Sequence, residues 1–143
     1  MEKVQRVVVG GLLIKEGEAL IVRRSPTEHV LPNLWELPSG KVDFGEDPVH
    51  ALIREYKEET ALDIEPVVPV SVFHYVVEKP GLIRHTIQVN YLVRLVVEES
   101  VKLSPAHLES KWVTESDLDC EYIDDVLRDT IKKGLMLSRR GCL

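Results

Sequence analysis

The chain has 143 residues, 44% hydrophobic and 29% charged, a composition that suits one globular domain spanning residues 1–143. Its formal net charge of −6 argues against a nucleic-acid polymer as partner, because phosphate neutralisation needs a basic surface. We also expect no membrane span and no signal peptide, and the two cysteines, which make no metal-binding spacing, favour a reducing cytoplasm.

The first elements in chain order are two strands. The β-branched apolar runs 4–14 and 18–24 are separated by the turn-forming sequence "KEGE" and predict a hairpin. Residues 25–48 are rich in proline and turn-forming residues and predict a loop. A loop of this length in a compact domain is usually functional.

A helix is expected from Pro48 to Thr60. Asp47 is a favourable N-cap, and proline suits the first helical position. The core-facing stripe is expected at helical period, on Val49, Leu52, Ile53 and Tyr56.

The second half predicts further strands at 67–77, 85–97 and 110–114, followed by an amphipathic helix over 122–137. Alternating apolar residues in the second of these strands are typical of a half-buried strand: Ile87, Val89, Tyr91, Val93 and Leu95. The element order indicates an α/β fold with a mixed sheet flanked by helices. The tail from about residue 138 is expected to be flexible.

Three glutamates share one side of the predicted helix near its C-terminus. Glu55, Glu58 and Glu59 stand at i, i+3 and i+4, where like charges repel and the helix dipole is unfavourable. The cost is only a few tenths of a kcal/mol per pair, so a solvated acidic face remains one interpretation. The other is a site for hard divalent cations such as Mg²⁺, which prefer oxygen ligands and bridge to phosphate.

The residues before the helix support the second interpretation. The sequence "GKVDFGE" places Gly40 and Glu46 at the helix entrance. Gly40 would let a backbone carbonyl or amide approach the same ions, although a simple turn glycine explains it equally well.

Taken together, "GKVDFGEDPVHALIREYKEETAL" (40–62) resembles the Nudix box, G-x5-E-x7-R-E-U-x-E-E-x-G-U with U apolar. The positions that match are Gly40, Glu46, Arg54, Glu55, Glu58, Glu59 and Leu62. Tyr56 departs mildly at an apolar position. Ala61 replaces the final glycine, so a different C-terminal helix geometry is expected there.

The resemblance implies a Nudix-type α/β/α sandwich, with a mixed β-sheet between helices, and a hydrolase that depends on Mg²⁺ or Mn²⁺. Such enzymes cleave nucleoside diphosphates linked to another group, by metal-assisted attack of water on phosphorus. The expected partner is a small-molecule nucleotide, and the chain is expected to be a monomer or homodimer.

Carried over by position, Glu55, Glu58 and Glu59 would be the catalytic metal ligands, joined by the carbonyl of Ser39 or Gly40. Arg54 would orient a glutamate through a charge-assisted hydrogen bond, and Glu46 would support the box or contact metal through water. The general base stays open between Glu55, a glutamate from a later loop such as Glu109, and another group. Glu109 reads equally well as an ordinary surface residue.

Substrate-binding candidates lie outside the box. Arg23 or Arg24 could hold phosphate where the second strand ends, and the alternative is a solvated strand-end charge. Aromatic and polar candidates for base recognition, each with a packing alternative, are His29, Asn33, Trp35, Phe73, His74 and Tyr75.

The favoured function is that of a MutT-type nucleoside triphosphate pyrophosphohydrolase, because the chain is short. The first alternative is an ADP-ribose or nucleotide-sugar pyrophosphatase. An alternative of another class is a catalytically silent Nudix-fold module that binds nucleotides, although the intact set of glutamates speaks against it.

Overall fold

The computed structural model describes residues 1–27, 32–120 and 122–141. Its elements are, in order, β1 (Glu2–Lys15), β2 (Glu18–Arg24), β3 (Trp35–Glu36), β4 (Ser39–Lys41), α1 (Pro48–Thr60), β5 (Ile64–Lys79), β6 (Leu82–Leu95), β7 (His107–Val113), the 3₁₀ helix η1 (Glu115–Leu118) and α2 (Asp125–Arg139). Within the described residues, no helix is long and apolar enough to span a membrane.

Strand β1 lies at the centre of the sheet. It runs parallel to β6 and antiparallel to β2 and β4, and β6 pairs antiparallel with β5 at the edge. The short strand β3 and strand β7 both pair with β2. The predicted mixed sheet is therefore confirmed, and so is the predicted hairpin of β1 and β2.

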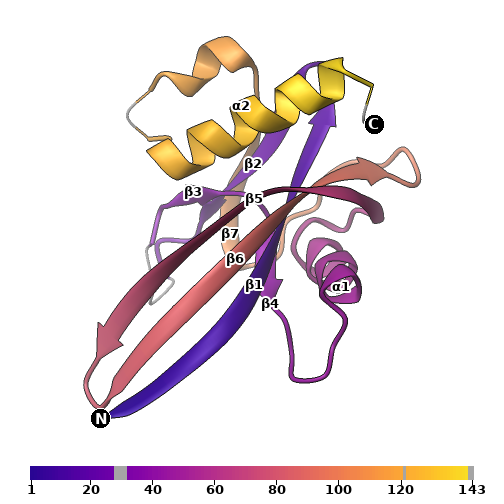
Figure 1. The fold of residues 1–143 in the computed structure, drawn as a ribbon. Helices are drawn as coiled ribbons and strands as arrows, with labels where there is room; N and C mark the ends of the chain where they lie inside the picture. The colour runs from indigo at the N-terminus through magenta and orange to yellow at the C-terminus, as the bar shows by residue number, and fades with distance from the viewer. Residues whose placement is uncertain (28–31, 121, 142–143) are drawn as a thin grey trace.

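The two long helices cover opposite faces of this sheet, as Figure 1 shows for α1 and α2. One core cluster joins Leu12 and Leu92 to α2 through Leu127, Ile131 and Leu135. A second cluster joins the other sheet face to α1, through Val9, Leu13, Val93, Leu52 and Tyr56. Burial of apolar side chains on both faces produces the expected α/β/α sandwich.

Double coverage corrects the prediction of a half-buried strand at 85–97. Val93 packs beneath α1 as expected, but Asn90 and Leu92 on the opposite face are also buried. The alternation predicted one buried face because Asn90 and its polar neighbours on β6 break the apolar pattern, whereas α2 covers them in the fold.

Several element boundaries also differ from expectation. The predicted loop 25–48 contains β3 and β4, which are too short to produce a period-2 pattern. Strand β5 and the start of β6 extend well beyond the predicted ranges. Helix α1 has the predicted bounds, but Val49 in its expected stripe is 37% exposed. Helix α2 continues to Arg139, and residues 142–143 of the predicted tail lie outside the described residues.

The C-terminus of α1 was expected to change its geometry because alanine replaces glycine. Ala61 instead adopts the left-handed conformation, with φ 64° and ψ 10°, and its N–H donates to the Lys57 carbonyl. The prediction was wrong at this point. A non-glycine residue in this region stores roughly 1–2 kcal/mol of strain.

Candidate active site

Arginine 54 joins the entrance loop to helix α1. Its Nε and Nη2 donate to the two carboxylate oxygens of Glu46 at 2.9 and 2.8 Å, and Nη1 donates to Glu55 Oε1 at 2.8 Å. These hydrogen bonds, helped by the Asp43 N–H, lower the pKa of Glu46 to about 2. The bidentate pair holds the loop in place against the first turns of the helix.

Glycine 40 lies directly beneath the Glu55 side chain. A Cβ at this position would stand 2.0 Å from the Glu55 Cδ. The glycine is therefore required by the close approach of the carboxylate, rather than only by a turn. Burial raises the pKa of Glu55, and the Arg54 hydrogen bond opposes that rise.

Glutamate 59 is the most enclosed acid of the box. Its Oε1 accepts the backbone N–H of Ser39 at 3.1 Å, so it faces strand β4. Burial raises the pKa of Glu59 to about 8, and the negative charge of Glu36 adds to that rise. An ionised carboxylate at this point is costly without a cation beside it.

The third box glutamate lies differently. The Glu58 side chain is 58% exposed, and its Oε1 stands 3.5 Å from Arg54 Nη1. The structure thus brings Glu55 and Glu59 against β4 and leaves Glu58 on the outer side of the helix. In the part of the chain that is described, no three His, Cys, Asp or Glu groups already form a metal-binding cluster.

A second acidic group, missed at the level of sequence, stands beside Glu59. Glu36 Oε2 accepts from Arg24 Nη1 at 3.3 Å and from His107 Nε2 at 3.0 Å. The His107 ring is buried, and its Nδ1 has no hydrogen-bond partner. Strand β2 brings Glu36 of β3 and His107 of β7 together, because it pairs with β3 on one side and with β7 on the other.

The sequence feature that signals this cluster is the run "LWELPSGK" (34–41), which leads into the box and contains Glu36. Glu109, the sequence candidate from the later segment, instead forms an ion pair with Arg23 at 3.0 Å across β2 and β7. It does not line the pocket described next.

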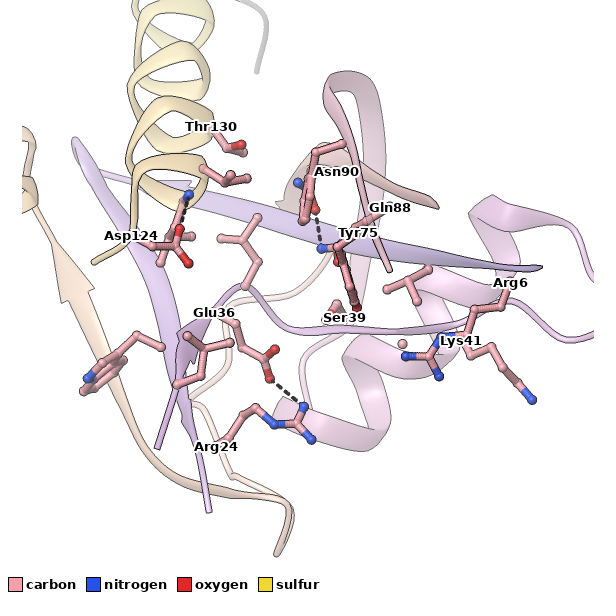
Figure 2. Close-up of a pocket in the computed structure, with 18 of the residues that line it drawn as sticks. Arg6, Arg24, Glu36, Ser39, Lys41, Tyr75, Gln88, Asn90, Asp124 and Thr130 are labelled. Atoms are coloured by element: carbon pink, nitrogen blue, oxygen red, sulfur yellow. Dashed lines mark hydrogen bonds and ion pairs between the residues drawn. The ribbon is translucent and has the colours of Figure 1, made fainter. Parts of the chain in front are cut away.

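A pocket of about 480 Å³ is lined by Glu36, whereas Glu55, Glu58 and Glu59 are not among its lining residues. Figure 2 shows Arg24 and Glu36 on one side of it, Asp124 at the start of α2, and Arg6 with Lys41 at the far end. Its floor is the α2-facing side of the sheet, which presents Phe73, Tyr75, Arg84, Gln88 and Asn90. Ser39 and Gly40 form the wall nearest the box.

The substrate-binding candidates separate in this view. Arg24 and Trp35 line the pocket, whereas Arg23 and Asn33 do not. Trp35 is buried and contacts Tyr122 with ring centroids 5.6 Å apart.

The aromatic candidates on β5 also divide. Phe73 and Tyr75 lie on the pocket side, stacked at 6.1 Å, whereas His74 contacts His85 instead. The candidate His29 falls outside the described residues.

Comparison with known proteins identifies the class. The NUDIX domain model matches residues 4–133, nearly the whole chain. The protein therefore belongs to the Nudix hydrolase family. The fold agrees, since the MutT protein of Methanosarcina mazei superposes with a TM-score of 0.80 at 27% identity, covering 97% of this chain and 99% of that one.

Two curated relatives carry different activities in their names. The 8-oxo-dGTP diphosphatase of Escherichia coli is 37% identical over 62 residues, which are 43% of this chain and 46% of that protein. The ADP-ribose pyrophosphatase of Bacillus subtilis is 27% identical over 119 residues, 82% of this chain and 56% of that protein. The matched segments thus span less than two thirds of these curated relatives.

Proposed function

We propose that this chain is a Mg²⁺- or Mn²⁺-dependent pyrophosphohydrolase that cleaves a nucleoside triphosphate or a related nucleoside diphosphate derivative. The observation that carries the proposal is the position of Glu55 and Glu59 against the backbone of Ser39 and Gly40, which lines a pocket, with the charge of Glu36 near enough to raise the pKa of Glu59. Their mutual repulsion and burial destabilise the folded chain unless a cation joins them.

The donor set fits a hard divalent ion. Glu55 and Glu59 would supply carboxylate oxygens, Gly40 or Ser39 a carbonyl, and Glu58 a further oxygen from the next side of the helix. The absence of a Cβ at Gly40 leaves the space in which Glu55 and the backbone approach one another. A bound ion would neutralise phosphate oxygens and lower the pKa of water.

The remaining chemistry belongs to side chains of the chain itself. Arg54 holds Glu55 in one orientation, and Arg24 presents a guanidinium to the pocket beside Glu36. Glu109 pairs with Arg23, whereas Glu36 lines the pocket and Glu55 lies against Gly40 of its wall. Glu36 and Glu55 are therefore the carboxylates proposed to accept a proton from water. His107 would keep Glu36 oriented through its ring N–H.

Two substrate classes remain in competition. Similarity to the 8-oxo-dGTP diphosphatase of E. coli favours a nucleoside triphosphate as substrate. The pocket also offers the aromatic pair Phe73–Tyr75 and the amides of Gln88 and Asn90 as contacts for a base. The B. subtilis ADP-ribose pyrophosphatase, whose match covers most of this chain, favours the second class.

The decisive variant is Glu59→Gln, which keeps the shape of the side chain and removes its charge. We expect turnover to fall about 100-fold or more, and we expect the Mn²⁺-induced rise in Tm of the wild type to disappear. Glu109→Gln, which removes a carboxylate outside the pocket, is the matched control and should keep both properties. Near-normal Mg²⁺-dependent turnover of Glu59→Gln would contradict the assignment.

The substrate class needs a separate experiment. Triphosphates and diphosphate-linked sugars are incubated with the wild-type chain and Mg²⁺ or Mn²⁺ in water enriched in heavy oxygen. The product that carries the label identifies the attacked phosphorus, and relative kcat/KM values rank the two classes. No hydrolysis of any member of the panel would instead indicate a silent nucleotide-binding module.

A further inference from the structure

The floor of the pocket is built in rows by the register of three strands. Side chains that face α2 on β1, β6 and β5 stand opposite one another in four successive rows: Gly10, Asn90 and Ser71; Val8, Gln88 and Phe73; Arg6, Thr86 and Tyr75; Val4, Arg84 and Val77. Helix α2 reaches the first row, where Thr130 Oγ1 is 2.9 Å from Ser71 Oγ. The outer rows form the open part of the pocket.

Three cations gather at this open end. Arg6 and Arg84 come from neighbouring rows of adjacent strands. Lys41 of β4 stands opposite Val8, two residues from Arg6 along β1. All three line the pocket, and Figure 2 shows Arg6 and Lys41 at the end away from Asp124.

These cations lack the partners that similar side chains have elsewhere. Within the described residues, none of the three forms an ion pair, and Arg84 Nε is buried without a hydrogen-bond acceptor. Arg6 donates only Nε, to Thr86 Oγ1 at 3.0 Å. By contrast, the other half-buried arginines that the structure describes all contact a carboxylate: Arg23, Arg24, Arg54 and Arg128.

The contrast is informative because the chain is acidic, with a formal net charge of −6. Carboxylates are abundant, yet among the described residues none forms an ion pair with any of these three cations. A half-buried guanidinium loses part of its hydration, and an unpaired Nε adds to that cost. Such a group recovers the loss when an anion with several acceptor oxygens binds.

We infer that Arg6, Lys41 and Arg84 form a binding site for the terminal phosphate of a triphosphate chain. Lys41 directly follows Gly40 of the box, and Arg6 lies roughly 7 Å farther along the sheet. A polyphosphate held at the box therefore extends towards these cations, while its nucleoside lies towards Gln88, Asn90 and Asp124. The inference rests on the proposed function and deepens it.

The consequence is a choice between the two substrate classes. In a triphosphate, the group attached to the second phosphate is a third phosphate that these cations can neutralise. In ADP-ribose or a nucleotide sugar, the group attached to the second phosphate is an uncharged sugar, which gains nothing from them. The cluster therefore selects nucleoside triphosphates.

The test compares the double variant Arg6→Gln/Arg84→Gln with the control Lys3→Gln/Lys79→Gln. The control removes the same net charge from β1 and β5, at exposed residues outside the pocket. Binding of inorganic tripolyphosphate is measured by titration calorimetry in EDTA, and kcat/KM is measured with Mg²⁺ for a triphosphate and for ADP-ribose.

We expect the first variant to bind tripolyphosphate about tenfold or more weakly than the wild type, and the control to bind it normally. We also expect kcat/KM to fall about tenfold for the triphosphate, mainly through KM, with little change for ADP-ribose. Thermal melts confirm that both variants are folded.

Each result separates this inference from the proposed function. Suppose that the wild type hydrolyses none of the substrates, and that tripolyphosphate binding falls in the first variant alone. The anion site then stands and the proposed activity fails. Unchanged tripolyphosphate binding and unchanged substrate preference in the first variant overturn the anion site, even where hydrolysis is robust. Equal losses in both variants also overturn it, since they indicate only the net charge.

Discussion

The carboxylates at the loop side and the sheet side of helix α1 have pKa values shifted in opposite directions. On the loop side, Glu46 is clasped by Arg54 and the Asp43 N–H, and its pKa falls to about 2. On the sheet side, Glu59 is buried beside Glu36 and Glu55, and its pKa rises to about 8. Both acids belong to the same motif and are separated by 13 positions in the sequence.

The difference indicates which acid stabilises the loop and which acid, under the proposed function, would bind the cation. The charge of Glu46 is already balanced within the chain, so its contribution is to hold the loop. Among the described residues, Glu59 accepts one hydrogen bond, from Ser39, and this bond and the charge of Arg24 do not offset its burial, so a cation bound beside it would stabilise the carboxylate. The same reasoning, with the sign reversed, applies to Arg6 and Arg84 at the other end of the pocket.

The largest effect is expected on the sheet side, from Gly40→Ala. Its Cβ would overlap Glu55, so that carboxylate must move, and we expect turnover to fall about 100-fold. Overpacking should also lower the free energy of unfolding by about 1–3 kcal/mol. Kinetic assays and urea unfolding measure both effects. Ser39→Ala is the control on the same strand, because Ser39 contacts Glu59 through its backbone N–H; equal losses in both variants would refute the steric argument.

The loop side is tested by Arg54→Gln. Loss of the bidentate pair should raise the pKa of Glu46 from about 2 towards its ordinary 4.5, which NMR titration measures directly. Turnover should fall about tenfold, because Glu55 loses the group that orients it.

Arg94→Gln provides the reference for this variant, since Arg94 pairs with Glu65 on an exposed surface where ion pairs contribute little. It should leave both the Glu46 pKa and turnover unchanged. An unaltered Glu46 pKa in Arg54→Gln would show that the loop, rather than the arginine, sets it.

The pH dependence of stability above about pH 4.5 should reflect the ionisation of Glu59 on the sheet side and not that of Glu46. Because the pKa of Glu59 is higher in the folded chain, the folded chain binds more protons than the unfolded chain between about pH 4.5 and pH 8. Stability must therefore fall as the pH rises through this interval, by about 1–3 kcal/mol. The lowered pKa of Glu46 acts only at more acidic pH, where its effect has the opposite sign.

Urea unfolding in EDTA from pH 5 to pH 8 measures this fall. The Glu59→Gln variant should show a flatter profile, and saturating Mn²⁺ should flatten the wild-type profile by holding the carboxylate ionised. A profile equally steep in Glu59→Gln would assign the proton to another group.

The smallest effect is expected at the C-terminus of helix α1. Ala61→Gly removes the cost of a left-handed alanine but adds freedom to the unfolded chain, so we expect a gain of about 0.5–1 kcal/mol. Thermal unfolding measures the gain, and turnover should stay constant because Ala61 has no contact with the pocket. A lower Tm would indicate that the helix ends differently in solution.

Local spacing in the sequence was sufficient to predict helix α1, its Asp47 cap and the clustering of its glutamates, because helical period and capping act over a few residues. It also placed Gly40 beside them, through the Nudix resemblance. It did not show that Glu58 turns outward while Glu55 and Glu59 turn inward. That division depends on which part of the helix surface packs against β4.

Only the tertiary structure decided the contacts that join distant strands. Glu36 meets His107 across 71 positions because both flank β2, and the gathering of Arg6 with Arg84 depends on the parallel register of β1 and β6. A shift of one residue in either register would turn these side chains to the opposite face. Strand register is set by packing of the whole sheet, so no local pattern in the sequence reveals it.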